Sequence, residues 1–283
     1  MSLTAALIQM TSSDDPASNL EMARMYLRQA AAQGATLALT PEVTNCISTS
    51  SAHQNRVLQT ESEDATLAGL REEARALGLW VLVGSLALKT TDADGRFANR
   101  SFLIDPAGAI RARYDKIHMF DVQVSPSETY RESAGFRPGT SAHVAQTPFA
   151  TIGMSICYDL RFAHLYRALA KAGADVLTVP AAFSPITGAA HWETLLRARA
   201  IETGCFVLAP AQTGRHPVSD GQRARSTYGH SLVVAPWGEV LLDMGTDPGV
   251  GLVNLDLASV VAARDRVPSL FHDRAYTMPD APL

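Results

Sequence analysis

The sequence predicts a single α/β domain in which β-sheets are covered by helices. Three observations lead to this prediction. Short apolar segments typical of strands alternate with amphipathic segments typical of helices along most of the chain. Two hairpin patterns interrupt this alternation, and no linker divides the chain into two domains. No Gly-x-Gly-x-x-Gly sequence follows the first predicted strand, so a doubly wound Rossmann fold is the less favoured architecture.

The alternation begins at the N-terminus. Residues 4–10 read as a first strand, and residues 16–33 as an Ala-rich amphipathic helix that stops at Gly34. Residues 36–40 are predicted as a second short strand, and Glu42 follows almost directly. A carboxylate in this position lies at the C-terminal rim of a sheet, where α/β folds place their sites.

The pattern of apolar residues is weaker directly after Glu42. Residues 43–60 are rich in Ser, Thr and Asn, and we predict a long loop with Cys46 and His53 at the surface. Residues 63–77 are predicted as a helix, and residues 79–88 as a strongly apolar, buried strand.

Two hairpins with similar turns are expected in the two halves of the chain. The first joins residues 97–105 to 110–114 through Pro-Ala-Gly, and the second joins residues 229–235 to 239–243 through Pro-Trp-Gly. The similarity hints at an internally related pair of sheets.

A strand over residues 149–156 leads into Cys157, and a helical pattern begins at Leu160. A thiol at this junction is expected to be exposed, with the start of a helix nearby to favour its thiolate form. Residues 122–140, which precede the strand, are predicted as another long loop.

The remaining elements complete the alternation. Residue Cys205 begins a strand and is predicted to be a buried, inert thiol. The tail from about residue 264 contains three prolines and is expected to be irregular. The other expected elements are strands at 175–180, 205–209 and 250–255 and a helix at 188–204.

Composition excludes several classes of protein. The 283-residue chain is 47% hydrophobic, has a net charge of −4 and contains no basic block, so nucleic acid is not an expected partner. No apolar run is long enough to span a bilayer, and the N-terminus lacks the features of a signal peptide, so we expect a cytoplasmic protein. Three scattered cysteines do not make a disulfide framework, and no metal-binding spacing occurs.

Three ionisable residues are expected at strand ends: Glu42, Lys116 and Cys157. A thiol is a poor nucleophile until a neighbouring group removes its proton, which a carboxylate can do. An ammonium group in a pocket of low dielectric constant can stabilise the oxyanion of a tetrahedral intermediate. Together these residue types supply a base, an electrophile and a nucleophile for acyl transfer from a carbon–nitrogen bond.

These groups occur in Leu39-Thr-Pro-Glu42, Tyr114-Asp-Lys116-Ile-His and Ile156-Cys157-Tyr-Asp-Leu-Arg-Phe162. In order and spacing, the three stretches resemble the signature motifs of the nitrilase superfamily of carbon–nitrogen hydrolases. The resemblance covers nearly the whole chain. It implies a four-layer αββα sandwich that dimerises through its helices, so that a homodimer or higher homo-oligomer is expected. It also implies a small-molecule amide substrate and no metal or organic cofactor.

The resemblance assigns roles to individual residues. It implies Glu42 as the base, Lys116 as the oxyanion stabiliser and Cys157 as the nucleophile that forms a thioester. The family has a second glutamate in the loop before the nucleophile strand, and Glu132 stands in that place. Its implied role is to position Lys116 or the leaving amine, although pairing with a nearby arginine is the alternative.

The C-terminal half resembles the deaminated glutathione amidase branch, most clearly in Gln212-Thr-Gly-Arg215-His216. The implied reaction converts deaminated glutathione to α-ketoglutarate and Cys-Gly. The chain departs from this branch at Ala163-His164 and in an extended stretch at 217–225. An ω-amidase that acts on α-ketoglutaramate and an N-carbamoyl amide hydrolase remain alternatives.

Further residues are candidates for binding the substrate. Arg161 and Arg215 could each hold a carboxylate, and Arg161 could instead pair with Asp159. The backbone N–H of Tyr158 is a candidate oxyanion donor. On the resemblance, Phe183 and Thr187 are expected to line the acyl pocket.

Rival functions would use the same residues differently. An acyltransferase would share the three groups, and a binding protein would have lost one of them. A papain-like enzyme would use His118 or His230 as its base and would not depend on Glu42. His191 and His230 are predicted to be structural hydrogen-bonding residues.

Overall fold

The computed structural model describes residues 2–126, 128–219 and 224–278, and these contain two six-stranded sheets. The first sheet has the order β16-β1-β2-β3-β4-β5. Its strands are β1 (Ser2–Gln9), β2 (Leu37–Leu39), β3 (Trp80–Leu88), β4 (Ala98–Ile104), β5 (Ile110–Asp115) and β16 (Gly249–Asp256). The second sheet has the order β15-β14-β11-β10-β9-β8. Its strands are β8 (His143–Gln146), β9 (Thr151–Met154), β10 (Val176–Thr178), β11 (Phe206–Ala209), β14 (Leu232–Val234) and β15 (Val240–Asp243).

The two sheets repeat one arrangement. Strands β1, β2 and β3 are parallel, and β4 and β5 extend that sheet as an antiparallel hairpin. Strands β9, β10 and β11 are likewise parallel, and β14 and β15 extend them in the same way. At the opposite edges, β16 and β8 each pair antiparallel with the first parallel strand. The internally related sheets expected from the two similar turns are therefore confirmed.

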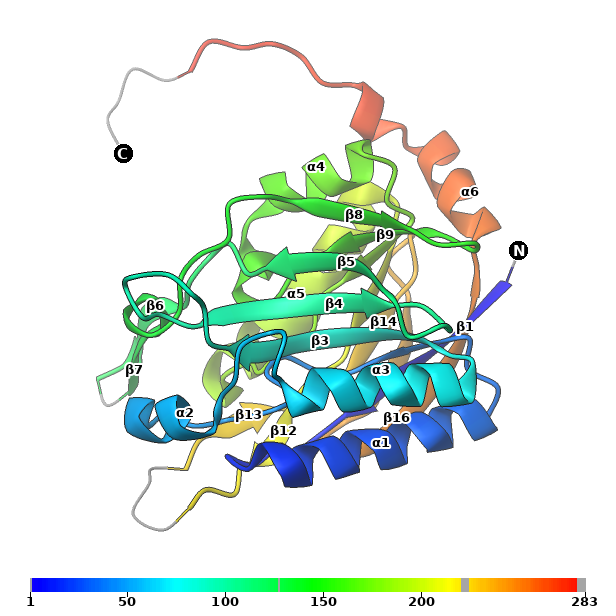
Figure 1. Ribbon diagram of the computed structural model, residues 1–283. Helices are drawn as coiled ribbons and strands as arrows, with labels where there is room; N and C mark the ends of the chain where they lie inside the picture. The colour runs from blue at the N-terminus through cyan, green and yellow to red at the C-terminus, as the bar shows by residue number, and fades with distance from the viewer. Residues whose placement is uncertain (1, 127, 220–223, 279–283) are drawn as a thin grey trace.

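The helices form the outer layers of the molecule (Figure 1). Helices α1 and α3 pack against the first sheet, and α4 and α5 against the second. The helices are α1 (Pro16–Ala32), α2 (Ser51–Val57), α3 (Ala65–Leu77), α4 (Ala163–Lys171), α5 (Pro185–Thr203) and α6 (Ala258–Arg266). The resulting four-layer αββα sandwich is the architecture that the resemblance implied.

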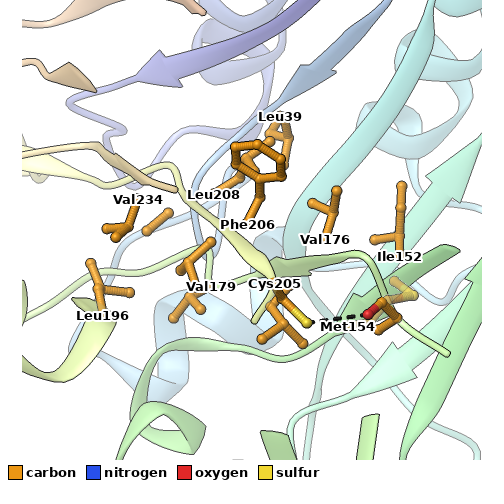
Figure 2. Close-up of a cluster of buried hydrophobic side chains, with 14 of the residues drawn as sticks. Leu39, Ile152, Met154, Val176, Val179, Leu196, Cys205, Phe206, Leu208 and Val234 are labelled. Atoms are coloured by element: carbon orange, nitrogen blue, oxygen red, sulfur yellow. Dashed lines mark hydrogen bonds between the residues drawn. The ribbon is translucent and has the colours of Figure 1, made fainter. Parts of the chain in front are cut away.

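Alternation along β1 shows how the layers are held together. Ala6, Ile8 and Met10 join a cluster with the apolar faces of α1 and α3, whereas Leu3 and Leu7 join the larger cluster between the sheets. Successive side chains of a strand point to opposite faces of its sheet, so one strand contributes to both cores. Figure 2 shows part of the larger cluster, where side chains of both sheets, such as Leu39 and Leu208, come together.

Several segments predicted as loops contain short regular elements. Residues 43–60 include α2, which Ser50 caps by accepting a hydrogen bond from the His53 N–H at 3.2 Å. Residues 122–140 include the hairpin β6 (Asp121–Ser125) and β7 (Glu128–Arg131) and the 3₁₀ helix η1 (Glu132–Ala134). Strand β8, helix α6 and the pair β12 (Thr213–Arg215) and β13 (Ser226–Tyr228) were also not predicted. These elements are too short for their periodicity to stand out from a polar composition.

The C-terminal segment begins with α6 and continues into the 3₁₀ helix η3 (Ser269–Phe271). Residues 272–278 have no regular secondary structure and extend away from the sandwich (Figure 1). In the described part of the chain, none of the helices is both long and apolar enough to cross a membrane.

His216 links the β12–β13 hairpin to the N-terminal strand and is fully buried. Its Nδ1 lies 2.8 Å from the Ser12 carbonyl oxygen, and its Nε2 lies 2.8 Å from the Thr227 hydroxyl. Burial lowers the pKa of this histidine to about 4. At a pH below the ordinary pKa of histidine, His216 is therefore protonated in the unfolded chain but stays neutral in the folded chain.

We expect His216 to make the protein less stable as the pH falls. Above about pH 6.5 His216 is neutral in both the folded and the unfolded chain. Between about pH 6.5 and about pH 4, the free energy of unfolding falls by about 3 kcal/mol in total. Urea unfolding at several pH values should show a shallower pH dependence for His216→Gln than for the wild type. The exposed His272 provides the control, since His272→Gln should retain the wild-type slope. Identical slopes for all three proteins would contradict the expectation.

Candidate functional site

The structure brings together the three ionisable residues that the sequence placed at strand ends. Glu42 follows β2, Lys116 follows β5 directly, and Cys157 begins the 3₁₀ helix η2 (Cys157–Arg161) after β9. Their exposed fractions are only 4%, 2% and 7%. The site is therefore a buried cluster between the sheets and not an exposed rim.

Lys116 is held between two carboxylates. Its Nζ donates to Glu42 Oε1 at 2.8 Å and to both carboxylate oxygens of Glu132 at 2.9 Å. Burial opposes the charge on the ammonium group, but Glu132 and Glu42 together raise the pKa of Lys116 well above its usual value. Lys116 is thus a fixed positive charge with little room to move.

Glu132 lies where the resemblance placed the second glutamate. Besides binding Lys116, its Oε2 accepts a hydrogen bond from the Phe120 N–H at 2.7 Å. Asn99 connects the two carboxylates, because its Nδ2 lies 2.9 Å from Glu42 and 3.3 Å from Glu132. The alternative, in which Glu132 pairs with a nearby arginine, is not what the structure shows, since its ion pair is with Lys116.

The carboxylate of Glu42 is surrounded by hydrogen-bond donors. Its Oε2 accepts the Ala182 N–H at 2.8 Å, and the Cys157 thiol hydrogen-bonds to the same carboxylate. Burial acts against ionisation, but the charge of Lys116 and the hydrogen bonds from Lys116 and the Cys157 thiol hold the pKa of Glu42 below its ordinary value. The carboxylate is therefore ionised while it touches the thiol.

Cys157 differs from the expectation in two ways. The thiol is buried, and burial together with the Glu42 charge raises its pKa well above the ordinary value, with Lys116 only partly opposing this. An exposed thiol with a lowered pKa was predicted, because the sequence does not reveal how much of the protein encloses the turn. The resting pair is therefore a neutral thiol and an ionised carboxylate.

The backbone at Cys157 is also constrained. Its φ is +49°, a left-handed value that is uncommon for a residue with a side chain, and its N–H donates to the Pro180 carbonyl at 2.9 Å. The buried Asp159 stabilises this turn by accepting hydrogen bonds from the Ile156 N–H at 2.9 Å and the Tyr114 hydroxyl at 2.7 Å. A strained backbone that its surroundings hold in place is a common feature of functional sites.

A cavity of about 670 Å³ opens onto the cluster. Of the residues expected to contact the substrate, Tyr158, Phe183 and Thr187 line it. Phe120 and Tyr130 add two aromatic rings to the wall. The volume is in the range that small-molecule sites occupy.

Arg161 and Arg215, the two arginines that the sequence suggested for a substrate carboxylate, do not line this cavity. Arg161 lies over the Phe183 ring, with 5.7 Å from its Cζ to the ring centroid, and it does not pair with Asp159 as the alternative proposed. Arg215 is exposed on β12. The cavity instead contains Arg225, near the end of the stretch that departs from the related branch.

The histidine that a papain-like enzyme needs is missing from the cavity wall, as far as the described residues show. His118 lies 2.7 Å from an Asp159 oxygen and stacks on Phe162 at 3.5 Å. His230 lies 3.0 Å from an Asp243 oxygen. Both rings therefore have partners outside the cavity.

Cys46 and His53 were expected at the surface, and both are buried. Burial, with a smaller contribution from Asp14, raises the pKa of the Cys46 thiol to about 12. Cys46 lines the cavity but lacks an adjacent base of the kind that Cys157 has in Glu42. Cys205 is buried among core residues, as predicted.

The residues of the site that sequence reasoning missed include Asn99, Glu128, Tyr130, Ala182 and Arg225. Ala182 acts through its backbone, which leaves no signal in the sequence. The other four lie in strands and loops whose side-chain directions depend on the fold. No group of three or more His, Cys, Asp or Glu side chains in the described ranges has the arrangement of a metal site.

Comparison with known proteins shows the family of the chain. Residues 4–265 match the family model described as carbon-nitrogen hydrolase. The chain is 37% identical over 270 residues to deaminated glutathione amidase of Yersinia enterocolitica, covering 95% of this chain and 92% of the relative. It is 39% identical over 272 residues to the Homo sapiens protein of the same name, covering 95% and 81%.

Solved structures show the same relationship. The Caenorhabditis elegans NitFhit protein superposes with a TM-score of 0.88 at 35% identity, and the match covers 96% of this chain and 65% of NitFhit. Nit3 of Saccharomyces cerevisiae, described as a member of branch 10 of the nitrilase superfamily, superposes with a TM-score of 0.80 at 25% identity, covering 94% of each chain.

Proposed function

The chain belongs to the carbon–nitrogen hydrolase family of the nitrilase superfamily, and on this basis we propose that it hydrolyses the amide bond of a small carboxylated substrate through a thioester on Cys157. It is a hydrolase that acts on carbon–nitrogen bonds other than peptide bonds. The observation that carries the mechanism is the contact of one ionised carboxylate, Glu42, with both the Cys157 thiol and the Lys116 ammonium group.

The first half of the reaction forms the acyl-enzyme. The sulfur of Cys157 bonds to the amide carbon while its proton passes to Glu42. The amide oxygen becomes an oxyanion, which the Lys116 ammonium group and the backbone N–H of Tyr158 stabilise. Glu42 then returns the proton to the departing nitrogen, the carbon–nitrogen bond breaks, and a thioester remains.

The second half releases the acid. Glu42 takes a proton from a water molecule as the water oxygen attacks the thioester carbon, and Lys116 again stabilises the oxyanion. The carbon–sulfur bond breaks, the thiolate regains the proton, and the carboxylic acid leaves. Glu132 acts as a positioning residue, because both of its carboxylate oxygens accept hydrogen bonds from the Lys116 ammonium group.

The substrate that we propose is deaminated glutathione, cleaved to α-ketoglutarate and Cys-Gly. Support comes from the relatives that carry the name deaminated glutathione amidase and match nearly the whole chain. The cavity of about 670 Å³ is large enough for both halves of such a substrate. The alternatives are α-ketoglutaramate, which would form the same thioester, and an N-carbamoyl amide.

We expect the wild-type enzyme to prefer deaminated glutathione to α-ketoglutaramate by at least about tenfold in kcat/KM. The two substrates share an acyl half, so the difference reflects the binding energy of the Cys-Gly leaving group. Measuring α-ketoglutarate release from both, with ammonia detection as a check, gives the ratio. A preference for α-ketoglutaramate would instead indicate an ω-amidase. Turnover of N-carbamoyl amides alone would support the third alternative.

The proposed setting is a cytoplasmic homodimer or higher homo-oligomer that works without a cofactor. Exposed apolar side chains on α6 and in the segment after it support an oligomer, among them Val261, Val267 and Phe271, which are 62%, 55% and 78% exposed. Sedimentation of the purified protein would test the oligomeric state.

A further inference from the structure

Arg225 is a cation on the cavity wall that the reaction steps above do not use. Its guanidinium lies over the Tyr130 ring, 5.5 Å from Cζ to the centroid, and its Nη2 donates to the Ala182 carbonyl. Stacking on the ring and this hydrogen bond hold the planar group in one orientation. Its Nε is buried and has no hydrogen-bond partner among the described residues. A buried N–H without an acceptor is costly, and an acceptor on a bound ligand would remove that cost.

The position of Arg225 relates it directly to the catalytic cluster. Ala182, whose carbonyl accepts from Arg225, donates its own N–H to Glu42 Oε2 at 2.8 Å. Burial works against the ionisation of Glu42, and the charges of Lys116 and Arg225 both lower its pKa. Arg225 is therefore linked to Glu42 through Ala182, and it lines the same cavity as Cys157.

Of the residues that the structure describes, Arg225 is the cation on the cavity wall that remains available to bind a negatively charged group of the substrate. Lys116 is already paired with Glu42 and Glu132. Arg131 also lines the cavity but is exposed to solvent, where an ion pair contributes little. A substrate carboxylate that entered the cavity without a cationic partner would lose its hydration shell without compensation, and this desolvation costs a large amount of free energy.

We propose that Arg225 is the specificity-determining residue that binds the carboxylate of the substrate's acyl half. The inference rests on the proposed function, because it assumes a carboxylated substrate. A guanidinium presents paired N–H donors that match the two oxygens of a carboxylate, and here it lies on an aromatic ring next to the base. The acyl half has only a short carbon chain between its carboxylate and the reacting carbon. Its carboxylate therefore fits a cation that is linked to Glu42 through Ala182.

The test uses two amides of equal length, glutaramate and pentanamide, which differ by a carboxylate in place of a methyl group. The wild type should prefer glutaramate. Arg225→Gln removes the charge but keeps a planar donor, and it should lower kcat/KM for glutaramate by roughly 10- to 100-fold more than kcat/KM for pentanamide. Any effect of the lost charge on Glu42 would change the turnover of both amides alike, so the ratio of the two isolates the contact with the carboxylate. Arg225→Lys, which keeps the charge without the fork, should retain part of the preference. Turnover of pentanamide confirms that each variant is folded and that its catalytic groups are intact.

Two comparisons make the result decisive. Arg215→Gln removes the rival cation on the neighbouring strand and should keep the wild-type preference. Calorimetric titration with glutarate gives a readout that needs no turnover, and Arg225→Gln should weaken the binding of glutarate by a similar factor. Equal losses on both amides, a preference that survives Arg225→Gln, or a loss that follows Arg215→Gln would each overturn the assignment. A wild type that neither prefers glutaramate nor binds glutarate would contradict the proposed class of substrate as well.

Discussion

Replacing Cys157 with alanine should lower kcat/KM for amide hydrolysis by at least about 10³-fold, because the sulfur forms the bond to the substrate. Glu42 and Lys116 would still bind and polarise the amide, but a direct attack by water would have to replace the thioester route. Intact-mass analysis after rapid quenching should show an acyl adduct on the wild type and none on Cys157→Ala.

The other two cysteines supply the controls for this experiment. Cys46 lines the same cavity, but burial keeps its thiol protonated, with a pKa of about 12. Cys205 is buried in the core. The adduct should therefore form on both Cys46→Ala and Cys205→Ala. An adduct that persists in Cys157→Ala, or that peptide mapping assigns to Cys46, would refute the role of Cys157.

Replacing Lys116 with arginine should lower kcat by about 10²- to 10³-fold, although the positive charge is kept. Lys116 is 2% exposed, and Glu42 and Glu132 hold its ammonium group at 2.8–2.9 Å. A planar guanidinium is larger than an ammonium group and cannot point one compact charge at the oxyanion from the same place. The loss should appear in kcat more than in KM, because the contact matters most in the transition state.

Thermal unfolding of Lys116→Arg shows whether the protein has folded, and Lys89→Arg is a matched substitution outside the cavity lining. The control should keep wild-type kinetics. Near wild-type turnover by Lys116→Arg would mean that Lys116 has only a structural role, and the assignment of the oxyanion stabiliser would have to be abandoned.

The position of the catalytic groups along the chain could be predicted because strand ends are local features. Glu42 and Cys157 each follow a short apolar run, which predicts a buried strand, and Lys116 follows the second strand of a hairpin with a Pro-Ala-Gly turn. Strands β2 and β5 point in the same direction within the first sheet, so Glu42 and Lys116 emerge at the same edge. Three motifs in register then identified the family from the sequence.

The arginine that faces the cavity could not be predicted in this way. Arg215 pairs with Ser226 in the β12–β13 hairpin, and Arg225 is the next residue to Ser226. Ser226 lines the cavity together with Arg225, whereas Arg215 is exposed and does not line it. Which of the two arginines lies on the cavity wall therefore depends on how the chain packs around the cavity and cannot be deduced from their spacing in the sequence.

The sequence by itself determined the alternation of strands and helices, the repeat of the two sheets and the family, because strands, turns and motifs are patterns of residues close together in the chain. The tertiary structure alone decided the electrostatics of the site. Glu42 meets Lys116, Ala182 and the Cys157 thiol across long stretches of chain. Burial disfavours the charged form of both acids, so the pKa of the thiol rises, whereas the Lys116 charge holds the pKa of the carboxylate below its ordinary value. Such shifts depend on distances and solvent exclusion between residues remote in sequence, and these exist only once the two sheets have packed face to face.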